Sequence, residues 1–283
     1  MTDEPGTERF AAMGTRVELH RFDGGADDAL WAARRAIEAV DDALTIHRPS
    51  PATAMNEALL SGQAAALDDE LLFDAVLAAA QGHAATQGLF DIAADTRTGA
   101  SWAMVSFDPQ SRRIVAERPL ALDFGGLGKG FALDRAVAVL RDAGVGSALL
   151  TLGESSVAVL GDHPLGGGWP FTIPHPEDPG QELLTLELVD QALSVSATVG
   201  AGTHAPERAA ITRPHTGTAV AAPLCAVAVE PSGTLAEVMS TALIAADDAA
   251  AAQLLRGREA SRFRFRFDLG LAHRPHPART LAA

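Results

Sequence analysis

The 283-residue sequence is poor in cysteine and in lysine. Cys225 is the only cysteine, so disulfide bonds and thiolate metal clusters are excluded within one chain. Its apolar neighbours predict that it is a small buried hydrophobic residue. Of the 22 lysine and arginine residues, Lys129 is the only lysine. Because arginine is used everywhere else, we infer that a compact ammonium group is needed at this position.

The chain also lacks long apolar segments and positive charge. No apolar run reaches the roughly 18 residues that a membrane-spanning helix needs. The first ten residues do not have the basic and apolar layout of a secretory signal, so we expect a cytoplasmic protein. The net charge of −14 argues against a nucleic-acid-binding surface, because phosphate backbones are bound by basic side chains. Any anion that the protein binds must therefore be met by a local set of donors.

The rest of the composition is ordinary for a globular protein, with 47% hydrophobic and 20% charged residues. Helical spacing of apolar residues predicts helices within 26–44, after Asp69, from Phe131 to Gly144, and from about Thr234 to Ala246. Short alternating runs predict strands at 15–22, twice within 112–124, repeatedly between 147 and 229, and from 261 to 269. Because strands and helices are partly segregated, we expect an α+β fold. We treat it as one domain, 1–283, with two lobes that would meet near 105–125.

The segment ALDFGGLGKGFALD, residues 121–134, places four glycines and Lys129 before a predicted helix. It fits neither the dinucleotide-binding pattern G-x-G-x-x-G nor the P-loop, because Phe131 and Gly130 stand at the deciding positions. A strand that ends at Asp123, a glycine turn and a helix that begins near Gly130 would still form an anion site. A tight structural turn, with Lys129 in a surface ion pair, explains the same residues equally well.

The predicted helix after Thr234 places Glu237 and Thr241 four residues apart, hence on one face. Their carboxylate and hydroxyl oxygens can bind a hard cation such as Mg²⁺. The spacing of Thr234 and Glu237 also matches a capping box, which requires no ligand, and the residues alone favour the cap. Two further segments, MGT at 13–15 and GLFD at 88–91, would not be singled out by themselves.

Taken in order, these segments resemble the FAD:protein FMN transferase family, also called ApbE. The resemblance covers nearly the whole chain, and no single motif in it is strong. The motifs are MGT at 13–15, Ser50 with Asn56, GLFD at 88–91, LDFGGLGKGFALD at 122–134, WPFTIPHP at 169–176, ATVG at 197–200, ITRPHTG at 211–217 and AEVMST at 236–241. Their shared order makes the resemblance specific.

The resemblance implies mixed or antiparallel sheets flanked by helices, with an FAD site between two halves. It also implies Mg²⁺-dependent transfer of FMN from FAD to a Thr or Ser hydroxyl of a client protein, with release of AMP. By the same resemblance, a carbonyl placed at Gly126 joins Glu237 and Thr241 at the metal, and Lys129 and Glu237 are catalytic. The residues expected to contact the nucleotide are Met13, Leu89, Phe90, Asp91, Asp123, Lys129 and the backbone near Ile211.

Four positions depart from the family pattern. Glu237 replaces the metal-binding Asp, Ala210 and Arg213 replace a His and an Asp, and Val199 replaces a Ser. If that His accepts a proton, its loss costs on the order of a hundredfold or more in rate. Three functions therefore stay open: a working transferase, an FAD-binding paralogue that serves as a flavin carrier or partner subunit, and a metal-dependent hydrolase that converts FAD to FMN and AMP.

The segment DTRTGAS, residues 95–101, resembles the acceptor sequence of the family's client proteins. It raises the hypothesis of self-flavinylation at Ser101.

Overall fold

The structure is a computed structural model that describes residues 5–95, 97–176, 178–199 and 211–267. Its large sheet has, in spatial order, strands β1 (Gly6–Ala12), β2 (Thr15–Asp23), β6 (Ser147–Leu152), β7 (Ser156–Leu160), β10 (Ala192–Ala197), β13 (Leu224–Glu230) and β14 (Arg262–Arg266). Three small sheets pair β3 (Ala65–Ala66) and β4 (Val105–Asp108) with β5 (Arg113–Ala116), β8 (Trp169–His175) with β9 (Asp178–Leu188), and β11 (Thr212–Arg213) with β12 (Thr218–Ala219).

The helices are α1 (Ala29–Leu44), α2 (Pro51–Leu60), α3 (Glu70–Ala85), α4 (Gly128–Asp142), α5 (Gly233–Ala245) and α6 (Asp248–Leu255), with a 3₁₀ turn at Trp102–Met104. Every strand pair in the described ranges is antiparallel. The α+β class expected from the sequence is confirmed. The single domain and the place where two lobes would meet stay predictions. The largest apolar core includes residues of α2, α3 and α5.

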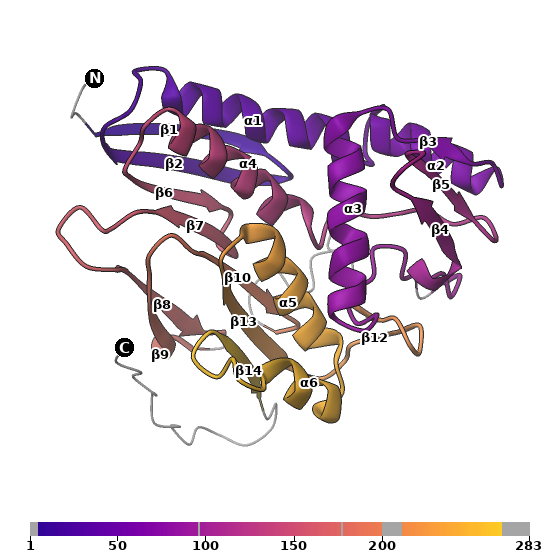
Figure 1. Cartoon of the computed structure of the whole chain (residues 1–283). Coiled ribbons are helices and arrows are strands. Elements are labelled where there is room, and N and C mark those ends of the chain that lie inside the picture. The colour runs from indigo at the N-terminus through magenta and orange to yellow at the C-terminus, as the bar shows by residue number, and fades with distance from the viewer. Residues whose placement is uncertain (1–4, 96, 177, 200–210, 268–283) are drawn as a thin grey trace.

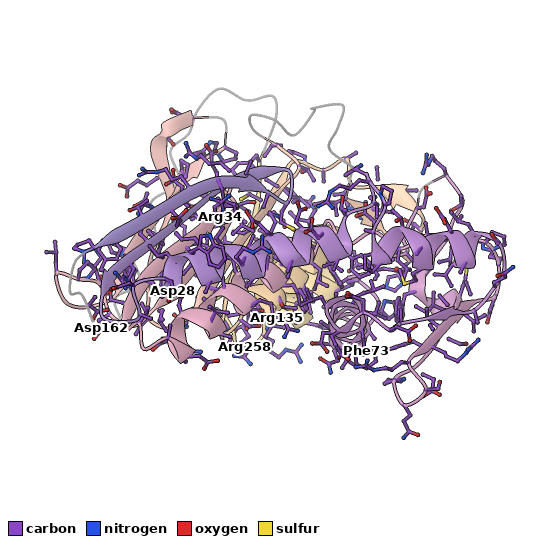
Figure 2. The ribbon with its side chains drawn as sticks, turned by 90° about the horizontal axis from the view of Figure 1, so that it is seen from above. Asp28, Arg34, Phe73, Arg135, Asp162 and Arg258 are labelled. Atoms are coloured by element: carbon purple, nitrogen blue, oxygen red, sulfur yellow. The ribbon has the colours of Figure 1, made fainter. Side chains whose placement is uncertain are left out.

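The two faces of the large sheet are covered by different elements. Helices α1, α4 and α5 pack on one face, and α2, α3 and the small sheet β3-β5-β4 lie beyond them (Figure 1). Figure 2 shows α1 and α4 from above, with Arg34 and Arg135 labelled. The β8-β9 hairpin covers the opposite face, where its residues Trp169 and Leu188 pack against Val157 and Val227 of the sheet. Strand β13 is therefore buried at all seven positions.

The segment before the glycine turn is not the strand that the sequence predicts. Only β5 forms, and residues 117–124 belong to no strand. The amide of Asn56 explains this, because its Nδ2 donates to the carbonyl of Leu122 at 2.9 Å and its Oδ1 accepts from Leu122 N at 2.8 Å. The next amide, Asp123 N, donates to the carbonyl of Ile92 at 2.8 Å. Side-chain and loop partners thus occupy the groups that a neighbouring strand would have bound.

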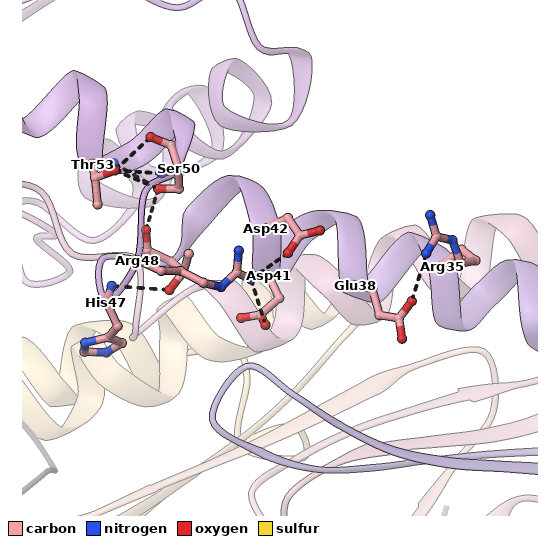
Figure 3. Close-up of polar contacts among 9 residues, drawn as sticks. Arg35, Glu38, Asp41, Asp42, His47, Arg48, Ser50 and Thr53 are labelled. Carbon is pink, nitrogen blue, oxygen red and sulfur yellow. Dashed lines mark hydrogen bonds and ion pairs between the residues drawn. The ribbon is translucent and has the colours of Figure 1, made fainter.

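Asn56 is held in place by a well-capped helix. Ser50 precedes α2, its hydroxyl accepts from Thr53 N at 3.0 Å, and its own amide donates to Thr53 Oγ1 at 2.7 Å (Figure 3). This is a capping box with Pro51 at the first helical position. Ser50 and Asn56, which the sequence joins in one motif, therefore fix α2 and, through it, the backbone just before the glycine turn.

Two glycines bring α4 and α5 into direct backbone contact. A Cβ atom built on Gly130 would lie 2.1 Å from the carbonyl oxygen of Gly233 and 2.7 Å from Cγ of Glu237. No side chain fits there unless the helices separate, because real Cβ atoms do not approach other atoms so closely. The glycine after Lys129 is thus required by the crossing of the two helices.

We expect Gly130→Ala to reduce the free energy of unfolding by about 3 kcal/mol, because the clash with Gly233 exceeds the gain in helix propensity. The matched control is Gly128→Ala in the same helix. Its Cβ would meet only the flexible end of Met13, Cε at 2.6 Å. We expect this control to change stability by less than about 1 kcal/mol. Urea unfolding followed by circular dichroism measures both, and equal effects would contradict the close crossing.

The only cysteine supports a second prediction. Cys225 lies in β13 with 2% of its surface exposed, as the sequence predicts, and burial raises the pKa of its thiol to about 12. At pH 8 about one thiol in ten thousand is ionised, and only the thiolate reacts. We expect no reaction of the folded protein with the thiol reagent DTNB and one equivalent in 8 M urea. Cys225→Ala should give none in either condition, and rapid labelling of the folded protein would refute the buried position.

Candidate active site

Lys129 and Glu237 form a partly buried ion pair where α4 begins beside α5. The Lys129 Nζ atom lies 3.3 Å from Oε1 of Glu237, with side chains that are 22% and 5% exposed. The hydroxyl of Ser156, on β7, donates to the same oxygen. Because its partner is buried, Lys129 is not in the surface ion pair that was one of the two interpretations of the glycine turn.

The capping box expected at Thr234 and Glu237 is wrong. The N-cap of α5 is Ser232, whose hydroxyl accepts from Leu235 N at 3.2 Å. Thr234 instead donates from its hydroxyl to Asp134 Oδ2 at 2.5 Å. Glu237 is one turn into the helix, and its carboxylate contacts Ser156 and Lys129. The Glu237 carboxylate therefore does not cap the helix and can take part in a binding site.

Gly126, Glu237 and Thr241, which the sequence proposes as metal ligands, lie together. Thr241 follows Glu237 by one turn of α5, and its Oγ1 lies 3.8 Å from a Cβ atom built on Gly126. Within the described residues, the Gly126 carbonyl, the Thr241 hydroxyl and Oε2 of Glu237 have no hydrogen-bond partner. These three oxygens are the donor type that Mg²⁺ prefers, so the residues fit such an ion. Among all the residues that the structure describes, no group of three or more His, Cys, Asp or Glu side chains could hold a metal ion.

The glycine turn also presents backbone donors at the start of α4. The amides of Gly126, Lys129 and Gly130 donate to no carbonyl in the described ranges. Gly125 N donates to Oδ1 of Asp123 at 2.8 Å, which fixes the turn from its N-terminal side. Free amides, the positive end of the helix dipole and the ammonium of Lys129 favour the binding of an anion at this turn.

Met13 lies against the same turn. Met13 and Gly14 connect β1 to β2, with φ angles of 54° and 69°, so both have the left-handed backbone typical of tight hairpins. The Met13 side chain extends to the first residue of α4, where its Cε limits the space at Gly128. A hairpin distant in the chain therefore forms one wall of the glycine turn.

The segment 88–91 uses its side chains mainly within the protein. Leu89 and Phe90 are buried, and the Phe90 ring lies 3.5 Å from a Cβ atom built on Gly126. The Asp91 carboxylate accepts from Ser101 Oγ at 2.7 Å and from Trp102 N at 3.0 Å. Ser101, the hypothetical self-modification site, is thus held in a hydrogen bond. Nucleotide contacts by 88–91 stay a prediction.

The positions that depart from the family pattern are only partly described. Val199 is buried in the second core, and Arg213 lies in the short β11-β12 hairpin. Ile211 is half-buried next to the main core, and its carbonyl accepts from Val220 N at 2.9 Å. Ala210 lies outside the described residues. Nucleotide binding near Ile211 therefore also stays a prediction.

Two polar residues of the site, Ser156 and Asp134, are not predicted from the sequence. Ser156 begins an apolar strand and has no unusual neighbours, and Asp134 lies five residues after Lys129 in α4. Asp134 accepts from Gly233 N at 2.6 Å and from Thr234 N at 2.9 Å, so it holds the first turn of α5. Both contact residues about 80 to 100 positions away, which leaves no local pattern.

Residues 93–263, well over half of the chain, match the model of the ApbE family. The chain belongs to the ApbE family. No curated protein sequence matches it significantly.

Solved ApbE structures share the fold. The apo flavinyl transferase ApbE of Pseudomonas stutzeri is 21% identical, with a TM-score of 0.79, and the match covers 95% of this chain and 93% of that one. The flavin transferase ApbE of Vibrio cholerae is 16% identical, with a TM-score of 0.76 and coverage of 93% and 97%. An ApbE protein of Thermotoga maritima is 18% identical, with a TM-score of 0.76 and coverage of 91% and 93%. At these identities the likeness establishes the fold.

The contact between Asp134 and α5 supports a pH-dependent prediction. Burial raises the pKa of Asp134, although the donors from Thr234 and Gly233 oppose the shift. We expect Asp134→Asn to cost about 1–3 kcal/mol of stability at pH 4.5, because an amide nitrogen then faces backbone donors. Since the folded state binds the carboxyl proton more tightly than the unfolded chain does, the advantage of wild type over the variant should shrink as the pH rises above about 4.

Urea unfolding of both proteins between pH 4.5 and 8 measures this difference. Asp74→Asn is the control, because Asp74 is half-exposed and pairs with Arg135 at 2.6 Å between α3 and α4. We expect it to cost less than about 1 kcal/mol. A gap between wild type and Asp134→Asn that widens with pH would contradict the raised pKa.

Proposed function

We propose that this ApbE-family protein transfers FMN from FAD to a Ser or Thr hydroxyl of a client protein and releases AMP, in the presence of Mg²⁺. The observation that carries the proposal is the Lys129–Glu237 pair beside a glycine turn that has free amides and that approaches Thr241 at Gly126. One side of this site offers donors for a phosphate, and the other offers hard oxygens for a cation. The cytoplasmic location expected from the sequence is part of the proposal.

In this proposal the residues of the chain act by placement and by charge. The amides at the start of α4 and the ammonium of Lys129 bind the diphosphate and offset negative charge that grows on the leaving AMP phosphate. Gly126, Glu237 and Thr241 would hold Mg²⁺, which supplies further neutralisation of phosphate charge when bound. The client hydroxyl forms the new phosphoester bond to the FMN phosphorus as the bond to the AMP oxygen breaks, and the hydroxyl proton is released.

A second candidate function is binding of FAD without transfer. It is favoured by Ala210, which replaces the His of the family pattern and carries no group that accepts a proton. Incubation with FAD, Mg²⁺ and a client peptide separates the alternatives. Protein- or peptide-bound FMN supports the transferase, unchanged FAD supports the binding protein, and free FMN with AMP supports the hydrolase. Intact mass, with Ser101→Ala as the control, shows whether the chain modifies itself.

Lys129 offers a direct test of FAD binding, because it is the only lysine. Reductive methylation with ¹³C-formaldehyde labels its amine and the N-terminus and preserves the positive charge. We expect FAD to shift the NMR signal of the methylated Lys129 and to leave the N-terminal signal in place. Saturating FAD that leaves both signals unchanged would argue against binding at the glycine turn.

Removal of the proposed metal ligands should reduce transfer. We expect Thr241→Val, which keeps the shape of the side chain, to lower kcat/KM at least about tenfold, and Glu237→Gln to lower it by about a hundredfold or more. Both should need more Mg²⁺ for half-maximal rate. The control is Thr151→Val on β6, a half-buried threonine outside the site, which should leave the rate unchanged. Wild-type kinetics in Thr241→Val would remove this residue from the metal site.

A further inference from the structure

Four buried serines, Ser156, Ser194, Ser196 and Ser240, lie in or next to α5, and they differ in their hydrogen-bond partners. Ser240 shares hydrogen bonds of 2.9 Å with both Ser194 and Ser196, and its hydroxyl also donates to the Glu237 carbonyl at 3.2 Å. Ser156 pairs with Ser194 across β7 and β10, and both are 1% exposed. Of these serines, only Ser156 contacts the carboxylate of Glu237.

We propose that Ser156 is a positioning residue, which holds the Glu237 carboxylate so that a defined oxygen faces the metal. This inference rests on the proposed function. Ser156 donates a hydrogen bond to Oε1 of Glu237, and Lys129 Nζ forms an ion pair with the same oxygen at 3.3 Å, whereas Oε2 has no hydrogen-bond partner within the described residues. The two contacts therefore distinguish two oxygens that are chemically identical, and they leave Oε2 free of hydrogen bonds on the helix that also carries Thr241.

The need for such a residue follows from the length of the glutamate. Glu237 has one more rotatable bond than an aspartate, and ordering it costs entropy and allows misplacement. Mg²⁺ requires near-ideal octahedral geometry, so a loosely held ligand binds it poorly. The hydroxyl of Ser156 is carried by a rigid central strand, whereas Lys129 reaches the carboxylate through a flexible stem. Gly130 leaves the space that the Glu237 Cγ occupies.

A purely structural role for Ser156 makes a different prediction. In that case the hydroxyl would only satisfy a buried carboxylate, and its loss would lower stability without a specific effect on metal binding. Ser194 is the matched control, because it is the cross-strand neighbour of Ser156, is equally buried, and hydrogen-bonds to Ser240 rather than to the carboxylate.

The experiment measures the affinity for Mn²⁺, used in place of Mg²⁺, in the presence of FAD. Free Mn²⁺ is followed by EPR, so the readout does not depend on transfer activity. We expect Ser156→Ala to weaken Mn²⁺ binding about tenfold or more, as is typical for groups that orient metal ligands. Ser194→Ala should change it less than about twofold. Ser156→Cys, which keeps the shape but donates weakly, should lie between wild type and Ser156→Ala.

A double-mutant cycle identifies the route of the effect. If Ser156 acts through Glu237, then Ser156→Ala should not weaken Mn²⁺ binding further in a Glu237→Gln background. An additive loss, or equal losses in Ser156→Ala and Ser194→Ala, overturns the positioning role.

The outcomes also separate this inference from the proposed function. Wild type that binds Mn²⁺ with FAD but matches Ser156→Ala in affinity refutes the positioning role alone. A specific loss in Ser156→Ala without any transfer by wild type supports the positioning role and refutes the transferase. Wild type that binds no Mn²⁺ refutes the metal site and, with it, both proposals.

Discussion

The candidate site depends on the close approach of α4 and α5. With glycine at positions 130 and 233, the two helix backbones touch, and no residue with a Cβ atom fits at Gly130. This contact places the first turn of α4, with its free amides and Lys129, beside the second turn of α5, with Glu237. Asp134 fixes the same crossing from the other side through the amides of Gly233 and Thr234. Two glycines and one carboxylate thus determine the distance between the positive and negative halves of the site.

Most helix positions and the pairing of Glu237 with Thr241 could be predicted from the sequence, because both depend on residues three or four apart. Helix α2, which begins at Pro51 directly after the Ser50 cap, is not among the predicted helices. The helix expected from Thr234 to Ala246 is observed at Gly233–Ala245, and Asp69 caps α3 as expected. The partners of those residues could not be predicted. Ser156, Lys129 and Asp134 each contact α5 across about 80 to 110 residues, and no periodicity relates positions that far apart.

Two of the wrong predictions have the same cause. The expected strand before Asp123 and the expected capping box at Thr234 were both inferred from local patterns, and a distant side chain replaced the local partner in each case. Asn56 occupies the backbone of Leu122, and Asp134 takes the hydroxyl of Thr234. Both replacements lie next to the candidate site. Tertiary contacts therefore override local preference where the chain must present particular groups, which is where such exceptions are expected.

The clamp of Asn56 on Leu122 has a consequence for folding. The backbone that leads into the glycine turn is held by α2 through a contact between residues 66 positions apart. Contacts of such high sequence separation form late, since the intervening loop must close first. A chain in which α2 has not docked would therefore lack the backbone that leads into the candidate site at the glycine turn.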